Sequence, residues 1–328
     1  MVNSGHSSNL PPFHIELLGA PEFCRDTGIR YPYLGGSMAK GISSVELAIA
    51  LGRAGMLGFF GAAGLPVEAV ETAIDQLAAS GVPFGCNLIH SPQEPDLEAA
   101  LAELYIRKNV QLVEASAFLA LTLPLVRYRL HGIHRSADGS IVTPNRIIAK
   151  VSREELAEKF FSPAPEKLVA SLLQQGLITA EQAELAKLVP MAQDITAEAD
   201  SGGHTDNRPA LTLLPTIQSV AMRMQQQQGY KVQLRVGLGG GIGTPEAAAA
   251  AFSMGAAWIM VGSVHQACVE SGTSDAVRKM LAETRQADVT MAPAADMFEM
   301  GVTVQVLKRG TMFAMRASKL YELYRSHD

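Results

Sequence analysis

The stretch Lys231-Val-Gln-Leu-Arg-Val-Gly-Leu-Gly-Gly-Gly-Ile-Gly-Thr-Pro-Glu246 decides the fold. Its first six residues have the apolar content of a strand, and a run of glycines follows directly. Pro245 then opens a helix expected over residues 246–254, because proline is best tolerated in a first helical turn. A second apolar run, residues 257–261, also ends in glycine. The succession of strand, glycine loop, helix and strand is a βα unit, and repeats of this unit build a parallel sheet.

The same unit recurs throughout the preceding chain. With the two strands above, eight strands are expected, over residues 31–34, 56–60, 82–90, 110–115, 146–151, 188–195, 231–236 and 257–261. Helical patterns separate them, and glycine or polar residues follow most of them. This repeat predicts a (β/α)8 TIM barrel, a fold whose active sites form at the C-terminal ends of the strands. A doubly wound sheet is the alternative, but no switch in the pattern favours it.

Three segments flank or interrupt the expected barrel of residues 31–290. Residues 1–30 form an N-terminal extension, and residues 291–328 a C-terminal helical or loop extension that could be cut short of a longer protein. Residues 152–186 contain only helical patterns, including the capping box Thr179-Ala-Glu-Gln182. We expect this helical insertion after strand five to cover the active site and bind substrate. Phe160 and Phe161 could line an acyl tunnel there, although an aromatic pair on a helix is more often plain packing.

The composition excludes several classes of protein. Of the 328 residues 48% are hydrophobic and 18% charged, which indicates a large core. The net charge of −5 argues against a nucleic-acid partner. No apolar run reaches the roughly 20 residues that span a bilayer, and no signal-peptide pattern opens the chain, so we expect a cytoplasmic protein without a membrane partner. The cysteines (Cys24, Cys86, Cys268) and the histidines outside the central loop lack metal-ligand spacing, so no metal is expected.

Two glycine loops predict a phosphate site. Gly239, Gly240 and Gly241 follow strand seven, and Gly262 and Ser263 follow strand eight. Backbone N–H groups without a neighbouring Cβ can bind phosphate at the positive end of a helix, and this barrel commonly binds phosphate after strands seven and eight. The spacing fits neither a dinucleotide fingerprint nor a Walker loop. Flavin mononucleotide (FMN) fits better, with one phosphate on these loops and its flat ring across the barrel mouth.

The flavin ring would then approach residues at the ends of strands one, three and five. These candidate cofactor-binding residues are Gly35, Gly36, Ser37, Met38, Asn87 and Lys150. A lysine at this position could stabilise negative charge on a reduced flavin, or simply be solvated. Asn87 is a candidate amide partner for the ring, with hydrogen bonding inside the core as the alternative.

A polar cluster follows strand six. Glu198, Asp200, His204 and Asp206 lie within nine residues, with Gly202-Gly203 between them. Two adjacent glycines let the backbone approach a flat or charged ligand. His204 can face that same ligand as a catalytic residue, because the ordinary pKa of histidine, about 6.5, lies near working pH. The alternative is a solvated turn whose histidine has no chemical role.

Four segments of the sequence, residues 31–64, 146–165, 198–209 and 239–274, resemble the trans-acting enoyl reductases of polyketide and polyunsaturated fatty acid synthases. That group is a branch of the nitronate monooxygenase (2-nitropropane dioxygenase-like) superfamily. Nitronate monooxygenases usually carry Glu-Ala-Gly-Gly-His, whereas this chain has Ala199-Asp-Ser-Gly-Gly-His204, which fits the reductase branch better.

The resemblance implies an FMN-containing barrel, NADPH as reductant and an acyl carrier protein thioester as substrate. Hydride would pass from NADPH through FMN to Cβ of an α,β-unsaturated thioester, and His204 would stabilise the enolate oxygen or act as acid. Two alternatives stay open: an oxidase of the nitronate monooxygenase type that uses O2, and a non-catalytic protein that scaffolds a synthase.

Overall fold

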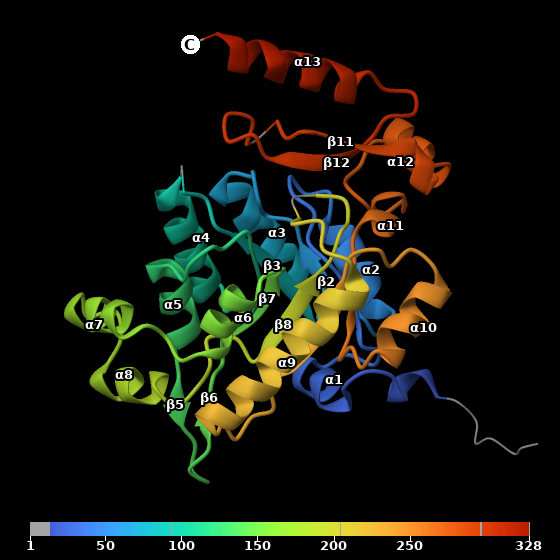
Figure 1. The fold of residues 1–328 in the computed structure, drawn as a ribbon. Coiled ribbons are helices and arrows are strands. Elements are labelled where there is room, and N and C mark those ends of the chain that lie inside the picture. The colour runs from blue at the N-terminus through green and yellow to red at the C-terminus, as the bar shows by residue number, and fades with distance from the viewer. Residues whose placement is uncertain (1–13, 93, 204, 296, 328) are drawn as a thin grey trace, which may run out of the picture.

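Eight parallel strands close into a barrel in the computed structural model, which describes residues 14–92, 94–203, 205–295 and 297–327 (Figure 1). The hydrogen-bonded order is β1-β10-β9-β8-β7-β4-β3-β2, and pairing of β1 with both β2 and β10 closes it. The strands are β1 (Tyr33–Gly35), β2 (Leu57–Phe60), β3 (Phe84–Ile89), β4 (Leu112–Ser116), β7 (Arg146–Val151), β8 (Asp194–Glu198), β9 (Arg235–Gly239) and β10 (Ile259–Val261). The predicted (β/α)8 TIM barrel is therefore confirmed.

Helices on the outside connect successive strands. They are α2 (Val45–Arg53), α3 (Val67–Ala79), α4 (Pro95–Arg107), α5 (Leu123–Leu130), α6 (Glu154–Phe161), α9 (Ala210–Gln228) and α10 (Pro245–Ser253). Side-chain caps fix several of their first turns, because an N-cap hydroxyl accepts from an N–H that lacks a helical partner. The Ser44 side chain accepts a hydrogen bond from Leu47 N at the start of α2. The Thr244 side chain, directly before Pro245, accepts one from Ala247 N at the start of α10.

The end of the barrel where the strands begin is closed by the N-terminal segment. After the 3-10 turn η1 (Ile15–Leu17), helix α1 (Pro21–Thr27) places Phe23 against Trp258, with ring centroids 4.2 Å apart. Trp258 is fully buried and donates its Nε1–H to Thr196 Oγ1 at 3.0 Å. A Cβ on Gly237 would lie 2.3 Å from the Trp258 ring, so glycine is needed beside the indole.

The expected helices lie within residues 152–186, but a helical insertion over the active site is not confirmed. Helix α6 is the ordinary connection after β7, and α7 (Glu166–Gln174) packs against α5. Helix α8 (Ala180–Ala186) contacts β5 (His134–Arg135), which pairs with β6 (Ile141–Val142) shortly before β7 begins. Figure 1 shows α7 and α8 beside this small hairpin, away from α13. Phe160 and Phe161 are fully buried in the core, so the plain packing alternative holds for them.

At the opposite end of the barrel the strands end, and we call this end the mouth. The last part of the chain covers it. This C-terminal arm (residues 263–327) contains α11 (Ser263–Gln266), α12 (Asp275–Ala282), the 3-10 turn η2 (Gln286–Asp288), β11 (Val289–Pro293), β12 (Thr303–Leu307) and α13 (Phe313–Ser326). Strands β11 and β12 form an antiparallel hairpin, which the sequence patterns did not predict. In Figure 1 the hairpin lies between the barrel and α13.

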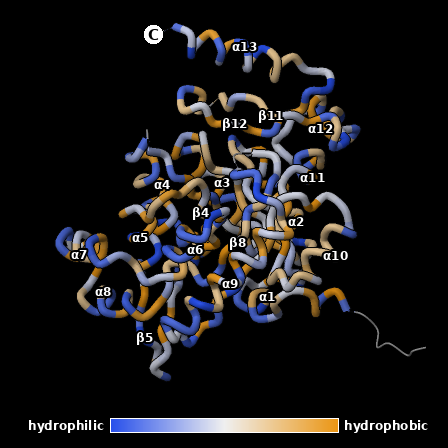
Figure 2. Tube along the Cα trace, viewed as in Figure 1, coloured by the Kyte–Doolittle hydropathy of each residue, from blue (hydrophilic) through white to orange (hydrophobic). Residues whose placement is uncertain are grey.

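Helix α13 differs from the barrel helices in its packing. Figure 2 shows hydrophobic and hydrophilic residues interleaved along it, and none of its residues is buried. Across the described ranges, no helix is long and apolar enough to cross a membrane.

Replacing Gly237 with alanine should lower the free energy of unfolding by about 1–3 kcal/mol, because the new methyl group overlaps the Trp258 ring. Urea denaturation followed by far-UV circular dichroism measures the change. Gly243→Ala is the matched control: its Cβ would meet only Val264 Cγ2, at 4.0 Å, so we expect a change within about 0.5 kcal/mol. Equal losses in the two variants would contradict the proposed overlap.

Candidate active site

A buried glutamate organises the floor of the mouth. Glu114 on β4 has no exposed surface, and its carboxylate accepts from Ser37 N at 3.0 Å and from Ser37 Oγ at 2.6 Å. Ser116 Oγ lies 3.4 Å from the same carboxylate. Burying a carboxylate is costly unless partners replace its water, and these groups supply part of that replacement. Glu114 was not predicted as a site residue, although a lone acidic residue inside the apolar run 110–115 could have indicated one.

Lys150 on β7 lies between two carboxylates. Its Nζ is 2.9 Å from Glu198 Oε1 and 3.3 Å from Glu114 Oε1. Burial lowers the pKa of Lys150, but the two carboxylates outweigh it and raise the pKa above its ordinary value. The amine therefore stays protonated at neutral pH, and its side chain is 17% exposed toward the mouth. Lys150 can thus present a fixed positive charge to a ligand but cannot act as a base.

Asn87 on β3 uses its amide nitrogen inside the barrel. Its Nδ2 donates to the backbone oxygen of Glu114 at 3.2 Å and to Ser116 Oγ at 3.0 Å. The residue is 4% exposed, and its backbone carbonyl accepts from Tyr105 OH. The amide nitrogen of Asn87 is therefore used in hydrogen bonds inside the core. This favours the structural alternative over a contact between that nitrogen and a cofactor.

The four residues predicted at the end of β1 differ in where they point. A Cβ on Gly35 would lie 2.3 Å from Leu51 of helix α2, so Gly35 serves packing on the outside of the barrel. A Cβ on Gly36 would instead lie 3.0 Å from Met260 Cγ. Ser37 is fixed on Glu114, and the Met38 side chain comes within 4.0 Å of the Cβ position of Gly262. Gly36, Ser37 and Met38 therefore lie at the mouth, and Gly35 ends β1 beside them with its Cβ position turned outward.

The glycine loops after β8, β9 and β10 meet at the mouth. A Cβ on Gly240 would lie 2.4 Å from the Ala199 carbonyl oxygen, and one on Gly202 would lie 2.9 Å from Ser263 Oγ. The Ala199 N–H also donates to Gly239 O at 2.8 Å. Gly203, Gly240 and Gly241 have φ values of 110°, 95° and 71°, which glycine adopts more easily than other residues. The structure therefore brings together the segments 199–203, 239–241 and 262–263.

Two contacts anchor the loop after β8. The Asp200 N–H donates to Arg208 O at 2.9 Å and closes the loop on itself. Asp206 accepts from Ser152 Oγ at 2.6 Å, and from Arg153 Nε and Nη2 at 2.8 and 2.9 Å. The Arg153 guanidinium, helped by Ser152, lowers the pKa of Asp206 to about 2. His204, predicted as catalytic, belongs to this loop but lies outside the described residues.

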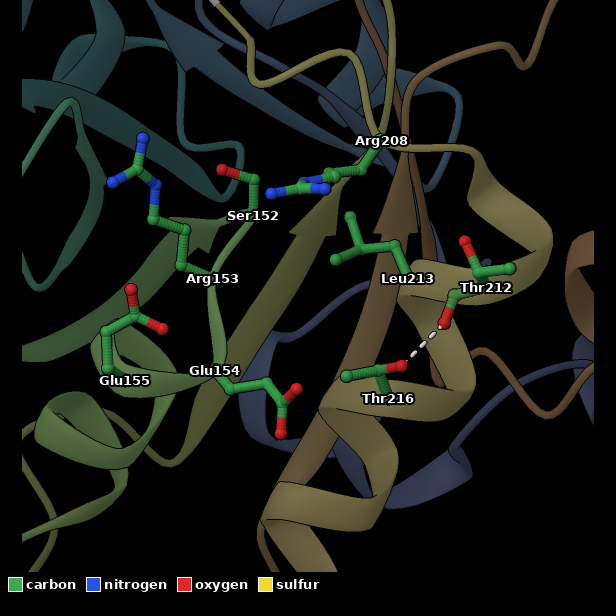
Figure 3. Close-up of a pocket in the computed structure, with 8 residues that line it drawn as sticks. All are labelled: Ser152, Arg153, Glu154, Glu155, Arg208, Thr212, Leu213 and Thr216. Atoms are coloured by element: carbon green, nitrogen blue, oxygen red, sulfur yellow. Dashed lines mark hydrogen bonds between the residues drawn. The ribbon is translucent and has the colours of Figure 1, made fainter.

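A cavity of about 370 Å³ lies on the outer side of this anchor, at the start of helices α6 and α9. In Figure 3 the Arg208 side chain points across it toward Ser152. The other lining residues are Arg153, Glu154, Glu155, Thr212, Leu213 and Thr216. Two arginines face two glutamates in this lining, so neither an anion nor a cation is favoured.

In the part of the chain that the structure describes, no group of three or more His, Cys, Asp or Glu residues is arranged to hold a metal ion. Cys24 and Cys86 are buried free thiols, and Cys268 is a partly buried one.

Comparison with known proteins identifies the sequence group. A model of the nitronate monooxygenase family matches residues 24–317. The chain is 52% identical over 331 residues to one subunit of the polyunsaturated fatty acid synthase of Thraustochytrium sp., covering 100% of this chain and 22% of that protein. It is 48% identical over 315 residues to the polyketide biosynthesis protein PksE of Bacillus subtilis, covering 95% of this chain and 41% of that protein. The chain thus spans less than half the length of either relative.

Two solved structures resemble the fold. The enoyl reductase domain of MlnA, from the macrolactin biosynthesis cluster of Bacillus amyloliquefaciens, superposes with a TM-score of 0.92 at 42% identity. The match covers 96% of this chain and 72% of that one. FabK of Thermotoga maritima superposes with a TM-score of 0.62 at 22% identity, covering 93% and 78% of the two chains, which shows a shared fold alone.

Lys150→Met should destabilise the protein by about 3 kcal/mol, because it leaves two carboxylates without their shared cation. Adding Glu114→Gln should recover part of that loss, since one of the uncompensated charges is removed. Urea denaturation of both single variants and the double variant measures the coupling. Lys187→Met, which breaks the exposed pair with Glu184, is the control and should cost less than about 0.5 kcal/mol. Additive losses would refute the coupling.

Asp206→Asn should loosen the loop after β8, because the ion pair with Arg153 is lost. Hydrogen exchange of peptides covering residues 199–209 should become about tenfold faster. The lowered pKa of Asp206 means that its stabilising effect is present above the ordinary aspartate pKa and is lost as pH falls toward 2. The difference from wild type should therefore be the same at about pH 6 and pH 8. Glu158→Gln, which removes the surface pair with Arg223, is the control. Unchanged exchange in Asp206→Asn would show that the anchor lies elsewhere.

Proposed function

The chain belongs to the nitronate monooxygenase family, and we propose that it is an FMN-dependent enoyl reductase. Its substrate would be an α,β-unsaturated acyl thioester on the acyl carrier protein of a polyketide or polyunsaturated fatty acid synthase, and its reductant NADPH. The proposal rests first on the 42% identity, across 96% of this chain, to the enoyl reductase domain of MlnA. The names of the synthase relatives agree with it.

The mouth offers residues that fit a flavin. The nitronate monooxygenase family is generally flavin-dependent. Gly240 and Gly241 have positive φ and carry no Cβ, and Ser263 adds a hydroxyl on the neighbouring loop. These groups would hold the phosphate through backbone N–H groups, as glycine loops commonly do. Gly202 and Gly203 would admit a flat ring near the same loops. When bound, the flavin supplies the hydride-transfer chemistry, which amino-acid side chains cannot provide.

Two side chains would act on charge at this site. Protonated Lys150, held by Glu114 and Glu198, places a positive charge where an electron-rich ring or a developing oxyanion needs one. His204 would donate a proton to the substrate or stabilise the enolate oxygen, by virtue of its place directly after Gly202-Gly203. The ion pairs with Glu114 and Glu198 position the Lys150 amine before any ligand binds, so little reorganisation would be needed during reaction.

The family match supports one further candidate function. A nitronate monooxygenase-type oxidase would use the same cofactor but pass electrons to O2 rather than to a thioester. Anaerobic mixing of the flavin-loaded protein with NADPH separates the two. For the reductase, loss of flavin absorbance should follow NADPH addition, and a crotonyl thioester of the carrier protein should restore it. Reduction of the oxidised flavin by a nitronate, with absorbance restored by O2 but not by the thioester, would favour the oxidase. A protein that binds no flavin would contradict both functions.

His204→Ala should leave flavin binding intact and slow thioester reduction by about 10²–10⁴-fold, the range expected for loss of a general acid. Stopped-flow absorbance measures the return of oxidised flavin after thioester is added to the reduced protein. His134→Ala, at an exposed position near the opposite end of the barrel, is the control and should react at the wild-type rate. Equal rates in His204→Ala and the control would refute a catalytic role for His204.

A further inference from the structure

We propose that the barrel-facing side of the β11–β12 hairpin binds the hydrocarbon chain of the substrate and sets the preference for chain length. This inference rests on the proposed function, because it assigns the place of the acyl chain in an acyl thioester substrate. We call this side of the hairpin the roof face, and it comprises Val289, Met291, Pro293, Thr303, Gln305 and Leu307.

The register of the hairpin defines the roof face. Met291 pairs directly with Gln305, and Val289 with Leu307. Directly paired residues of antiparallel strands point to the same side, as do residues two apart along a strand. Pro293 pairs with Thr303, and all six side chains therefore share one face.

A hydrogen bond shows which way this face points. Gln305 Nε2 donates to Asp200 Oδ1 at 3.0 Å, and Asp200 belongs to the loop after β8 at the mouth. The roof face is thus turned toward the mouth. The alternate pairs, Thr290 with Val306 and Ala292 with Val304, occupy the other face, and Ala292 is buried where β11 packs against α13.

The roof face is apolar but is not packed shut. Met291 is 38% exposed, and Val289 and Leu307 are partly exposed. Burial occurs at the inner end of β11, where Pro293 of the roof face and Ala292 of the other face are both buried. Apolar side chains that face the mouth therefore keep surface that a hydrocarbon could cover, which would stabilise binding by removing that surface from water.

The floor of the mouth has the opposite character. Glu114, Lys150 and Glu198 form a charged network there, and Asn87 lies beside it. A hydrocarbon chain gains nothing from such a surface, whereas a thioester carbonyl can use its positive charge. The two halves of the substrate therefore match two opposed surfaces, the thioester on the floor and the chain on the roof face.

The two aromatic side chains that the sequence suggested for an acyl tunnel cannot contact the acyl chain. Phe160 and Phe161 are fully buried among core residues. Met291, by contrast, has an unbranched and flexible side chain, which adapts to ligands of different shape. A roof of this kind would favour longer chains over a four-carbon chain, because each added methylene covers more apolar surface.

The test compares Met291→Asp with wild type on two carrier-bound substrates, crotonyl and trans-2-dodecenoyl thioesters. The ratio of kcat/KM for dodecenoyl to that for crotonyl should fall about tenfold or more, since burying one methylene alone changes affinity about fourfold. Met315→Asp is the matched control, because Met315 is an exposed methionine of α13 outside the roof face. It should leave the ratio unchanged. Leu307→Gln supplies a second roof-face variant in case Met291→Asp folds poorly.

A binding measurement separates this inference from the proposed function. Calorimetric titration of the flavin-loaded protein with saturated dodecanoyl and butanoyl pantetheine, without NADPH, reports chain binding independently of turnover. A loss of dodecanoyl affinity confined to the roof-face variants supports the inference even if the wild type reduces no enoyl thioester, which would end the proposed function alone. Wild-type reduction with an unchanged chain-length ratio in both roof-face variants, or the same loss in Met315→Asp, would overturn the inference alone.

Discussion

The carboxylate of Glu114 is the constraint on which the mouth depends. A charge without exposed surface must find partners, and this one draws Ser37 from the β1 loop and Lys150 from β7 to the end of β4. Lys150 in turn holds Glu198 on β8. One buried network therefore fixes the ends of four strands relative to each other. The positive charge that a cofactor or thioester would meet is set by this network rather than by a mobile side chain.

The two ends of the barrel differ in which side chains occupy them. At the end where strands begin, Arg235 joins Asp194 and Asp26, and Phe23 stacks on Trp258 nearby. Arg235 and Asp194 are buried, whereas the Asp26 side chain is 44% exposed. At the mouth, glycines replace side chains and the C-terminal arm stands over partly exposed groups. In this fold, active sites form at the end where the strands end, which is the mouth.

The barrel was predictable because parallel strands buried on both sides appear as short apolar runs, and glycine loops mark where they end. The meeting of residues 199–203, 239–241 and 262–263 also follows from the barrel, since all three segments follow neighbouring strands. Glu114 was missed because an acid within an apolar run does not reveal whether it faces the inside of the barrel. The helices of residues 152–186 were visible, but helical periodicity does not say which end of a barrel they cover. The β11–β12 hairpin was not predicted, because a long connection, residues 294–302, separates its strands and no tight-turn sequence marks them.

The contact between Gly202 and Ser263 has a consequence for how this protein can change through evolution. The space that a side chain at position 202 would need is already taken by the hydroxyl of Ser263, which lies 2.9 Å from the Cβ position. Gly240 and the Ala199 carbonyl share space in the same way. The three loops therefore fit together as one unit: a side chain at position 202 requires the Ser263 hydroxyl to move, and one at position 240 meets a backbone carbonyl that no substitution at position 199 removes. A loop transplanted singly from a relative would not fit, whereas the three loops transplanted together would keep their mutual contacts.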